Sequence, residues 1–223
     1  MSFIVAIDGP AGSGKGTVTK LVGEKLGLVN IDTGATFRCV TLEMLNKNIK
    51  IDEEEKIEEI LKNININLLE ENGKQKVVLN GEDVTLKIRS NEVNNFVSPV
   101  STLKIVRENL LNLQRKMAEN KNVIMEGRDI GTTVFPNANV KIYLDATPEE
   151  RARRRVKQNE EKGIKTSYEE ALENVKTRDK IDSEREIAPL KKAEDAIYID
   201  SSNMTIEEVV EKIVKIIKDA NRN

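Results

Sequence analysis

Residues 9–17 read GPAGSGKGT and follow directly on the apolar run Phe3-Ile4-Val5-Ala6-Ile7-Asp8. A tight turn between a strand and a helix needs one or two glycines, because glycine tolerates positive φ, but it has no use for a lysine. The spacing G-x-x-x-x-G-K of a phosphate-binding loop is met by Gly9, Gly14 and Lys15. In such a loop successive backbone N–H groups converge on phosphate oxygens at a helix N-terminus, and the lysine reaches the β- and γ-phosphates. This stretch therefore predicts a nucleoside triphosphate site.

The phosphate loop, as we call residues 9–17, departs from the general motif in one place. Gly16 follows the lysine where the motif has Ser or Thr, and the hydroxyl comes one residue later at Thr17. We expect the Lys15 side chain to be exposed, and Thr17 is a candidate contact for a metal ion that accompanies the nucleotide. The nucleotide-binding residues are then Gly9, Pro10, Ala11, Gly12, Ser13, Gly14, Lys15, Gly16 and Thr17.

Length and composition limit the remaining choices. The chain has 223 residues, which suits a single α/β domain over residues 1–223, and its net charge of −2 argues against a general nucleic-acid surface. No apolar stretch reaches membrane-spanning length, residues 1–8 lack the features of a signal peptide, and the one cysteine fits a reducing compartment. We therefore expect a cytoplasmic protein without nucleic-acid or membrane partners. The chain has no histidine, which removes catalytic triads, histidine-ligated zinc and histidine bases.

Strand and helix patterns alternate along the chain, which predicts a five-stranded parallel sheet with helices on both faces. The strands are expected at residues 3–8, 28–31, 123–125, 140–144 and 197–199. Helices are expected at residues 17–26, from the second strand to about residue 45, at 52–62 and at 101–120, and Asp52 is expected to cap the third of them. Three further helices are expected to begin at capping boxes, which pair Thr147 with Glu150, Ser167 with Glu170, and Thr205 with Glu208.

Residues 64–86 have a different character. Apolar residues alternate there, and turns are expected at Glu71-Asn72-Gly73-Lys74 and at Asn80-Gly81. This pattern predicts a small antiparallel sheet inserted into the alternating α/β chain.

Charged residues gather at strand ends and on two helices. Arg128 lies at a strand end, whereas Arg178, Asp182 and Arg185 share a helix face, which fits a ligand site or an ordinary salt-bridge ladder equally well. Arg151, Arg154 and Arg155 project together, and such a density of positive charge indicates a polyphosphate rather than plain surface. We expect these arginines to be exposed and to contribute little to folding. The loop Lys162-Gly163-Ile164-Lys165 between the two helices has the flexibility of a lid tip.

Five segments resemble the successive signatures of bacterial cytidylate kinases, in the right order and over nearly the whole chain: GPAGSGKGT, DTGATFR, EGRDIGTTVFP, KIYLDATPEERARRR and RDKIDSEREIAPL. The resemblance implies a P-loop nucleoside-monophosphate kinase fold of three layers. It also implies a monophosphate-binding insertion over residues 34–100, with the small sheet at about 64–86, and a lid over 149–170. Glu126 and Thr33 stand where the family has Asp and Ser more often, and both keep the functional group.

The resemblance also implies a reaction, the Mg²⁺-dependent transfer of the ATP γ-phosphoryl group to CMP or dCMP in pyrimidine metabolism. ATP would bind the phosphate loop. The implied catalytic residues are Lys15, Arg128, Arg151, Arg154 and Arg155. Thr33, Arg38 and Arg128 would hold the acceptor phosphate, Ser98, Arg107 and Asp129 would face the cytosine, and Arg178, Asp182 and Arg185 would reach the sugar and phosphate.

Three other functions compete with this one. The first is a kinase for another small acceptor such as AMP, UMP or shikimate. A GTPase-like switch needs an N-K-x-D segment, and the nearest match, Asn46-Lys47-Asn48-Ile49, lacks the aspartate. A nucleic-acid-binding module is disfavoured by the acidic net charge and by an aromatic content of 3%. We expect a monomer.

Overall fold

The computed structural model describes residues 2–71, 74–161 and 163–221. The predicted turn residues Asn72 and Gly73 and the predicted lid-tip residue Lys162 lie outside them. The chain forms two compact units, one of residues 1–31 with 118–223 and one of residues 32–117.

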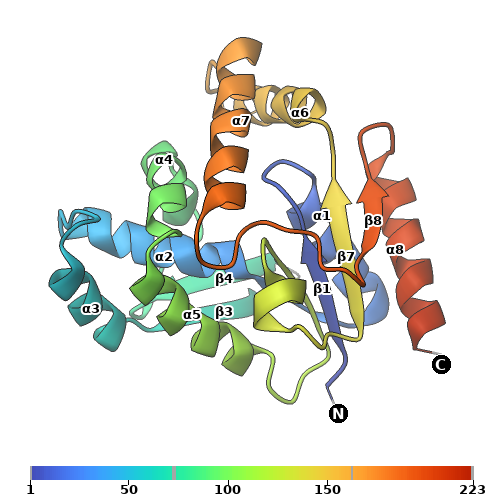
Figure 1. The fold of residues 1–223 in the computed structure, drawn as a ribbon, viewed down its shortest axis with the longest axis horizontal. Coiled ribbons are helices and arrows are strands. Elements are labelled where there is room, and N and C mark those ends of the chain that lie inside the picture. The colour runs from blue at the N-terminus through green and yellow to red at the C-terminus, as the bar shows by residue number, and fades with distance from the viewer. Residues whose placement is uncertain (1, 72–73, 162, 222–223) are drawn as a thin grey trace. The chain divides into compact units, whose positions relative to one another are not determined.

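The first unit is built around a five-stranded parallel sheet flanked by helices, as predicted (Figure 1). Its strands are β1 (Ile4–Asp8), β2 (Val29–Asp32), β6 (Val123–Gly127), β7 (Val140–Asp145) and β8 (Ile197–Asp200), in the order β2-β6-β1-β7-β8. Because β1 is central, the phosphate loop that follows it starts in the middle of the sheet. Ligands of such sheets bind beyond the carboxyl ends of the strands, which is where this loop lies.

Two helices pack on one face of this sheet and bury its apolar side chains. They are α1 (Lys15–Leu26) and α8 (Ile206–Ala220). Val18 and Val22 of α1 and Ile213 of α8 join Ile7 and Leu144 of the sheet in one buried cluster. The capping box predicted at the start of α8 forms completely, because Thr205 and Glu208 each bond the other's backbone N–H.

Helices α6 (Pro148–Glu160) and α7 (Tyr168–Glu184) follow β7 and pack against each other beyond the end of that strand (Figure 1). The hydroxyl of Thr147 accepts a hydrogen bond from the Glu150 N–H, and that of Ser167 from the Glu170 N–H. The N-caps are as predicted, but the capping boxes are not complete, and the Thr147 N–H donates to Ser202 Oγ instead of to Glu150. Arg185 lies one residue past the end of α7 with an extended backbone, so it does not share the helix face of Arg178 and Asp182 as expected.

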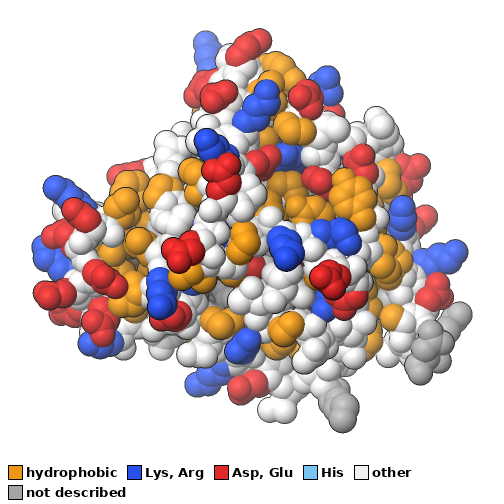
Figure 2. Space-filling view, viewed as in Figure 1, with side chains coloured by type: hydrophobic (Ala, Val, Ile, Leu, Met, Phe, Trp, Pro, Cys, Tyr) orange, Lys and Arg blue, Asp and Glu red, His pale blue; other side chains and the backbone are white. Residues whose placement is uncertain are grey.

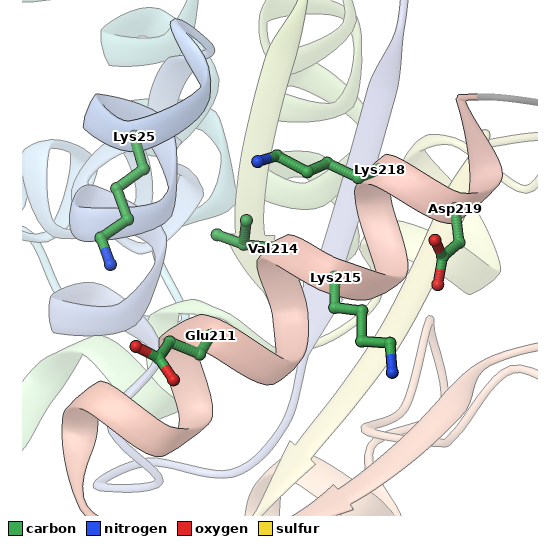
Figure 3. Close-up of a pocket in the computed structure, with 6 residues that line it drawn as sticks. All are labelled: Lys25, Glu211, Val214, Lys215, Lys218 and Asp219. Atoms are coloured by element: carbon green, nitrogen blue, oxygen red, sulfur yellow. The ribbon is translucent and has the colours of Figure 1, made fainter.

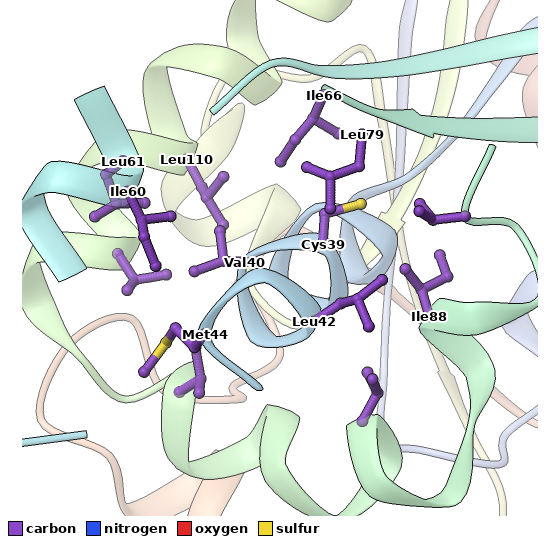
Figure 4. Packing of buried hydrophobic residues seen from close by; sticks show 14 of the residues in the cluster. Cys39, Val40, Leu42, Met44, Ile60, Leu61, Ile66, Leu79, Ile88 and Leu110 are labelled. Carbon is purple, nitrogen blue, oxygen red and sulfur yellow. The ribbon is translucent and has the colours of Figure 1, made fainter. Parts of the chain in front are cut away.

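The second unit combines helices with the predicted antiparallel sheet. Its elements are α2 (Thr33–Asn46), α3 (Glu54–Asn63), β3 (Ile66–Glu71), β4 (Lys74–Leu79), β5 (Glu82–Asp83), the 3₁₀ turn η1 (Lys87–Arg89), α4 (Asn91–Val100) and α5 (Lys104–Met117). The sheet order is β3-β4-β5 with antiparallel pairing. Figure 4 shows the apolar core of this unit, to which α2 contributes Cys39, Val40 and Met44, and α5 contributes Leu110.

Two sequence-based expectations in this unit are wrong. Helix α4 was not predicted, and the helix expected from residue 101 begins at Lys104 instead. Asp52 does not cap α3, whose N-cap is Glu53. On the face that Figure 2 shows, acidic and basic side chains are interspersed, in keeping with the net charge of −2.

Candidate active site

The phosphate loop has a backbone that only glycine adopts without strain. Gly14 has φ 93° and is the N-cap of α1, so the unpaired N–H groups at the start of this helix face the loop. Gly9 has φ 150°, and a Cβ atom on it would lie 2.0 Å from the carbonyl oxygen of Leu144 on β7. The close approach of β7 therefore requires the first glycine of the motif. The loop is a ready anion site at a helix N-terminus.

Lys15 is buried, which corrects the expectation that its side chain is exposed. Only 5% of the residue is accessible, and Nζ donates to the Pro10 carbonyl oxygen at 2.7 Å and to Ser13 Oγ at 3.3 Å. Burial, and after it the positive charge of Arg128, lower the pKa of Lys15 to about 7 against the opposing effect of Glu126. A bound phosphate would favour the ammonium form, so an anion and this lysine match each other electrostatically.

Gly16, in the first turn of α1, lies beside the carboxylate of Glu126 on β6. A Cβ atom on Gly16 would be 3.2 Å from Glu126 Oε1. The hydroxyl of Thr19 donates to the Lys15 carbonyl oxygen at 2.9 Å and also lies 3.4 Å from Glu126 Oε1. Glu126 thus occupies the space next to the residue at which the general motif carries Ser or Thr. The exposed residue Thr17 stays outside this contact.

Arg151 and Arg154 hold the phosphate loop by its carbonyl oxygens. Arg151 is 3% exposed; its guanidinium donates to both oxygens of Asp179 on α7, at 2.9 and 2.6 Å, and to the Ala11 carbonyl oxygen at 3.2 Å. Arg154 donates to the Ser13 carbonyl oxygen at 3.3 Å and to the Ser201 carbonyl oxygen at 2.7 Å. The expectation that Arg151, Arg154 and Arg155 are exposed is wrong: Arg151 is buried in a pair with Asp179, and Arg154 and Arg155 are half-buried.

Arg155 differs from its two neighbours. It is half-buried, and among the described residues its side chain has no hydrogen-bond or ion-pair partner. Burial alone lowers the pKa of Arg155. A desolvated guanidinium without a counter-anion is unfavourable, and an anion beside it would remove that cost.

The structure brings together the predicted acceptor residues of the first unit. Arg128 Nε donates to Asp182 Oδ2 at 2.9 Å, and Arg185 Nη2 donates to Asp129 Oδ1 at 3.2 Å. Burial alone would raise the pKa of Asp182, but Arg128 and Arg178 outweigh it and hold the pKa below its usual value. Three guanidinium groups thus surround two carboxylates, an arrangement suited to a ligand that carries phosphate and polar edges.

Three residues of this region were not predicted from the sequence: Asp8, Asp179 and Ser201. Ser201 Oγ donates to the Asp145 carbonyl oxygen at 2.8 Å and lies 3.3 Å from the Ser13 carbonyl oxygen. Asp8 was signalled by its place as the one charged residue at the end of an apolar strand. Neither Asp179 nor Ser201 has a comparable signal, because each acts through a partner far away in the chain.

The second unit contains the other predicted acceptor residues. Thr33 begins α2, whose N-cap Asp32 accepts a hydrogen bond from the Ala35 N–H at 3.2 Å. Arg38 Nη1 donates to the Ile88 carbonyl oxygen at 3.1 Å and to Asn94 Oδ1 at 2.7 Å. Both of these predicted phosphate contacts are therefore on α2, one at its N-terminus and one held by neighbouring elements.

Ser98 and Arg107, the predicted cytosine contacts of this unit, are both 7% exposed. Arg107 Nη1 donates to the Ser101 carbonyl oxygen at 3.0 Å, and its guanidinium lies over the ring of Phe37, 5.3 Å from the centroid. The contact with the ring and the bond to the carbonyl oxygen hold the guanidinium in place.

A surface hollow between α1 and α8 is separate from this site, since it contains no residue of the phosphate loop (Figure 3). It is lined by Lys25, Glu211, Val214, Lys215, Lys218 and Asp219. In the described part of the chain no three Asp, Glu or Cys side chains cluster so as to hold a metal ion. The helices among residues 2–71, 74–161 and 163–221 include none with the length and apolarity of a membrane span.

The fold is shared with two solved kinase structures. A gluconokinase from Sinorhizobium meliloti 1021 superposes with a TM-score of 0.50 at 10% identity, covering 98% of this chain and 92% of that one. A sugar kinase from Janibacter sp. HTCC2649 gives a TM-score of 0.51 at 12% identity, covering 98% and 95%. At these identities the likeness concerns the fold alone.

Curated relatives are much more similar in sequence. A cytidylate kinase of Fusobacterium nucleatum subsp. nucleatum is 52% identical over 97% of this chain and 98% of its own length. One from Caldicellulosiruptor saccharolyticus is 52% identical over 95% and 94%, and one from Bacillus subtilis (strain 168) is 47% identical over 98% and 97%. The sequence model of the family described as cytidylate kinase matches residues 5–219. The chain, with its phosphate loop and clustered arginines, therefore belongs to the cytidylate kinase family.

Proposed function

We propose that the protein transfers the γ-phosphoryl group of ATP to the 5′-phosphate of CMP or dCMP, giving ADP and CDP or dCDP. The observation that supports this reaction is the combination of a phosphate loop with family membership over nearly the full chain. A phosphate oxygen of the acceptor is already a nucleophile at neutral pH, so no general base is needed. Catalysis then consists of in-line positioning and neutralisation of charge on the transferring group.

On the ATP side, residues 9–17 hold the phosphates through backbone N–H groups, and Lys15 leaves its contact with the Pro10 carbonyl oxygen to reach them. Mg²⁺ accompanies ATP and neutralises charge on the β- and γ-phosphates. The exposed hydroxyl of Thr17, on the first turn of α1, is a candidate oxygen ligand of a kind that suits a hard cation.

On the acceptor side, Thr33, Arg38 and Arg128 hold the monophosphate, and Arg178, Asp182 and Arg185 contact the sugar and phosphate. The insertion over residues 34–100 is then the monophosphate-binding part, and residues 149–170 are a lid that excludes water. The partners are small nucleotides, the protein works as a monomer in the cytoplasm, and it has no nucleic-acid or membrane partner.

We expect a clear preference for cytosine. Cytosine presents acceptors at O2 and N3 and a donor at N4. Arg107 is an obligate donor, an ionised Asp129 is an obligate acceptor, and the Ser98 hydroxyl serves as either. Uracil reverses the pattern at N3 and at position 4, so each mismatch leaves a buried group unpaired, at a cost of roughly 1–3 kcal/mol.

The test is kcat/KM for CMP, dCMP, UMP and AMP under the same Mg·ATP conditions. CMP should exceed UMP by about 10- to 100-fold, and AMP should be poorer still because the second ring of a purine needs more volume. Asp129→Asn should narrow the ratio of CMP to UMP, because an amide both donates and accepts. If UMP or AMP matches CMP, the roles assigned to Ser98, Arg107 and Asp129 are wrong and a general monophosphate kinase remains.

Among the lid arginines, we assign the contact with the transferring phosphoryl group to Arg155, because it alone lacks a partner among the described residues. Arg155→Ala should lower kcat by about 10²-fold. The matched control is Arg153→Ala on the same helix, where the replaced guanidinium is exposed and pairs with Glu150, and its kcat should stay close to that of the wild type. Equal kcat values in the two variants would show that Arg155 does not contact the transferring phosphoryl group.

A further inference from the structure

Asp8 is a buried carboxylate that the reaction above does not use. It is the last residue of β1, directly before the phosphate loop, and is 4% exposed. Its Oδ1 accepts a hydrogen bond from the Ile130 N–H and its Oδ2 one from the Gly131 N–H, both at 2.7 Å. The two bonds join residues more than 120 positions apart in the chain.

The bonded N–H groups belong to the segment that carries two predicted acceptor residues. Arg128 and Asp129 directly precede Ile130, which begins the single π-helical turn η2 (Ile130–Val134). The first N–H groups of such a turn have no partner within it, and here the Asp8 carboxylate satisfies two of them. Asp129 takes part in the same turn, because its carbonyl oxygen accepts from the Thr133 N–H at 2.8 Å.

The fit around this contact is close. A Cβ atom on Gly131 would lie 3.4 Å from Asp8 Oδ2 and 3.2 Å from Cδ of Lys141, so a glycine at 131 lets the backbone approach the carboxylate. Lys141 is itself held by Asp195, with Nζ–Oδ distances of 2.7 and 2.9 Å. The segment after β6 is thus fixed against β1 and β7.

We propose that Asp8 is a positioning residue that holds the Arg128–Asp129 segment in register with the phosphate loop. The inference rests on the proposed function, since it concerns the distance between the ATP phosphates and the acceptor phosphate. In-line transfer depends on that distance, and misplacement by about 1 Å can cost 10²-fold in rate. Asp8 acts through the backbone and touches neither substrate.

The ionisation of Asp8 couples this contact to pH. Burial, and to a smaller extent the negative charge of Asp129, raise the pKa of Asp8 to about 6 against the opposing effects of the two backbone N–H groups and Lys15. The other titratable groups facing it are Lys141 beside Gly131 and Tyr143 on β7. A protonated carboxyl has one oxygen that donates rather than accepts, so one of the two bonds is lost below about pH 6.

The test compares Asp8→Asn with the wild type and with Asp200→Asn, a matched change at the exposed last residue of β8, whose carboxylate bonds Ser202 nearby in the chain. Asp8→Asn should lower kcat at least about tenfold while both KM values stay within threefold, because each loop is intact and only their register is loosened. The fall of kcat below about pH 6 should disappear in Asp8→Asn and persist in Asp200→Asn. A purely structural role would lower the melting temperature and leave kcat and its pH profile unchanged, which would overturn the proposal.

If Asp8→Asn does not fold, the pH dependence of kcat in the wild type tests the proposal. In the wild type at saturating CMP and Mg·ATP, kcat should fall below about pH 6. A kcat that is independent of pH down to 5, in protein that circular dichroism shows to be folded, overturns the proposal. Wild-type protein that transfers no phosphoryl group to CMP would instead contradict the proposed function, and the two failures are thereby distinguished.

Discussion

Gly16 stands where the general phosphate-loop motif has Ser or Thr, and its neighbour in space accounts for the glycine. The Glu126 carboxylate lies 3.2 Å from the position that a Cβ atom on Gly16 would take, which is tighter than ordinary van der Waals contact. At position 126 the resemblance to cytidylate kinases leads us to expect Asp more often than Glu. Glu126 and Gly16 thus meet at one contact, in which the carboxylate lies beside a residue that has no side chain.

This contact predicts coupling between the two positions. Alanine at an ordinary helix position stabilises by up to about 1 kcal/mol relative to glycine. In Gly16→Ala the clash with Glu126 should cancel this gain, whereas in the Glu126→Asp background the shorter side chain should let it appear. The interaction energy should be at least about 0.5 kcal/mol, measured as free energies of unfolding in urea for the four proteins. The same effect of Gly16→Ala in both backgrounds would contradict the coupling.

Helices α6 and α7 are joined by a buried ion pair that changes what the lid arginines are expected to do. Arg151 on α6 bonds both oxygens of Asp179 on α7 and also the Ala11 carbonyl oxygen of the phosphate loop. A helix with four arginines in five residues would otherwise be strongly self-repelling. Here Arg151 pairs with Asp179, and Arg153 and Arg154 share Glu150, which leaves Arg155 for an anion.

Arg151→Ala should therefore destabilise the protein. Removing one partner of a buried pair leaves the other charge uncompensated, and because Asp179 keeps some access to water, we expect the lower end of the usual range, about 3 kcal/mol. Arg153→Ala, at an exposed pair on the same helix, should change the free energy of unfolding by less than about 0.5 kcal/mol. Urea denaturation measures both. Equal stability of the two variants would show that the pair does not hold the helices together.

At the scale of the whole molecule, two buried charges of the nucleotide site affect global stability. Lys15 has a pKa lowered to about 7, and Asp8 one raised to about 6. Between these values both groups are charged and desolvated in the folded protein. Sites that bind charged substrates commonly carry such perturbed groups, at a cost to the stability of the ligand-free protein.

The sign of the pH dependence follows from Lys15. In the unfolded chain its ammonium titrates near 10.5 and in the folded protein near 7, so above pH 7 the unfolded state binds more protons. The free energy of unfolding of the ligand-free protein should then rise between pH 7 and 8.5. In Lys15→Met the free energy of unfolding should lose the part of this increase that comes from Lys15. In Lys20→Met, where the replaced lysine belongs to an exposed pair on the same helix, the increase should be the same as in the wild type. An unchanged slope in Lys15→Met would contradict the lowered pKa.

Much of the fold and part of the site could be predicted from the sequence. Local sequence patterns predict the phosphate loop, the five parallel strands, the small antiparallel sheet and the N-caps at Thr147, Ser167 and Thr205. Helix α4 was not predicted, because Pro99 in its last turn is a residue that usually ends a helix. Val93, Val97 and Val100 nevertheless have helical spacing. A proline is tolerated there because it removes a single bond near the end of the helix.

The sequence by itself determined that a nucleotide-binding loop follows a central buried strand, and that its chemistry rests on arginine, lysine and carboxylates. Only the tertiary structure decided that Lys15 is buried, that Arg151 pairs with Asp179, and that Asp8 holds the backbone at Ile130. The physical reason lies in the range of the interactions. Spacing along the chain shows which residues share a helix face or a strand, whereas burial and the partner of a charge depend on segments brought together by the sheet from far apart in the chain.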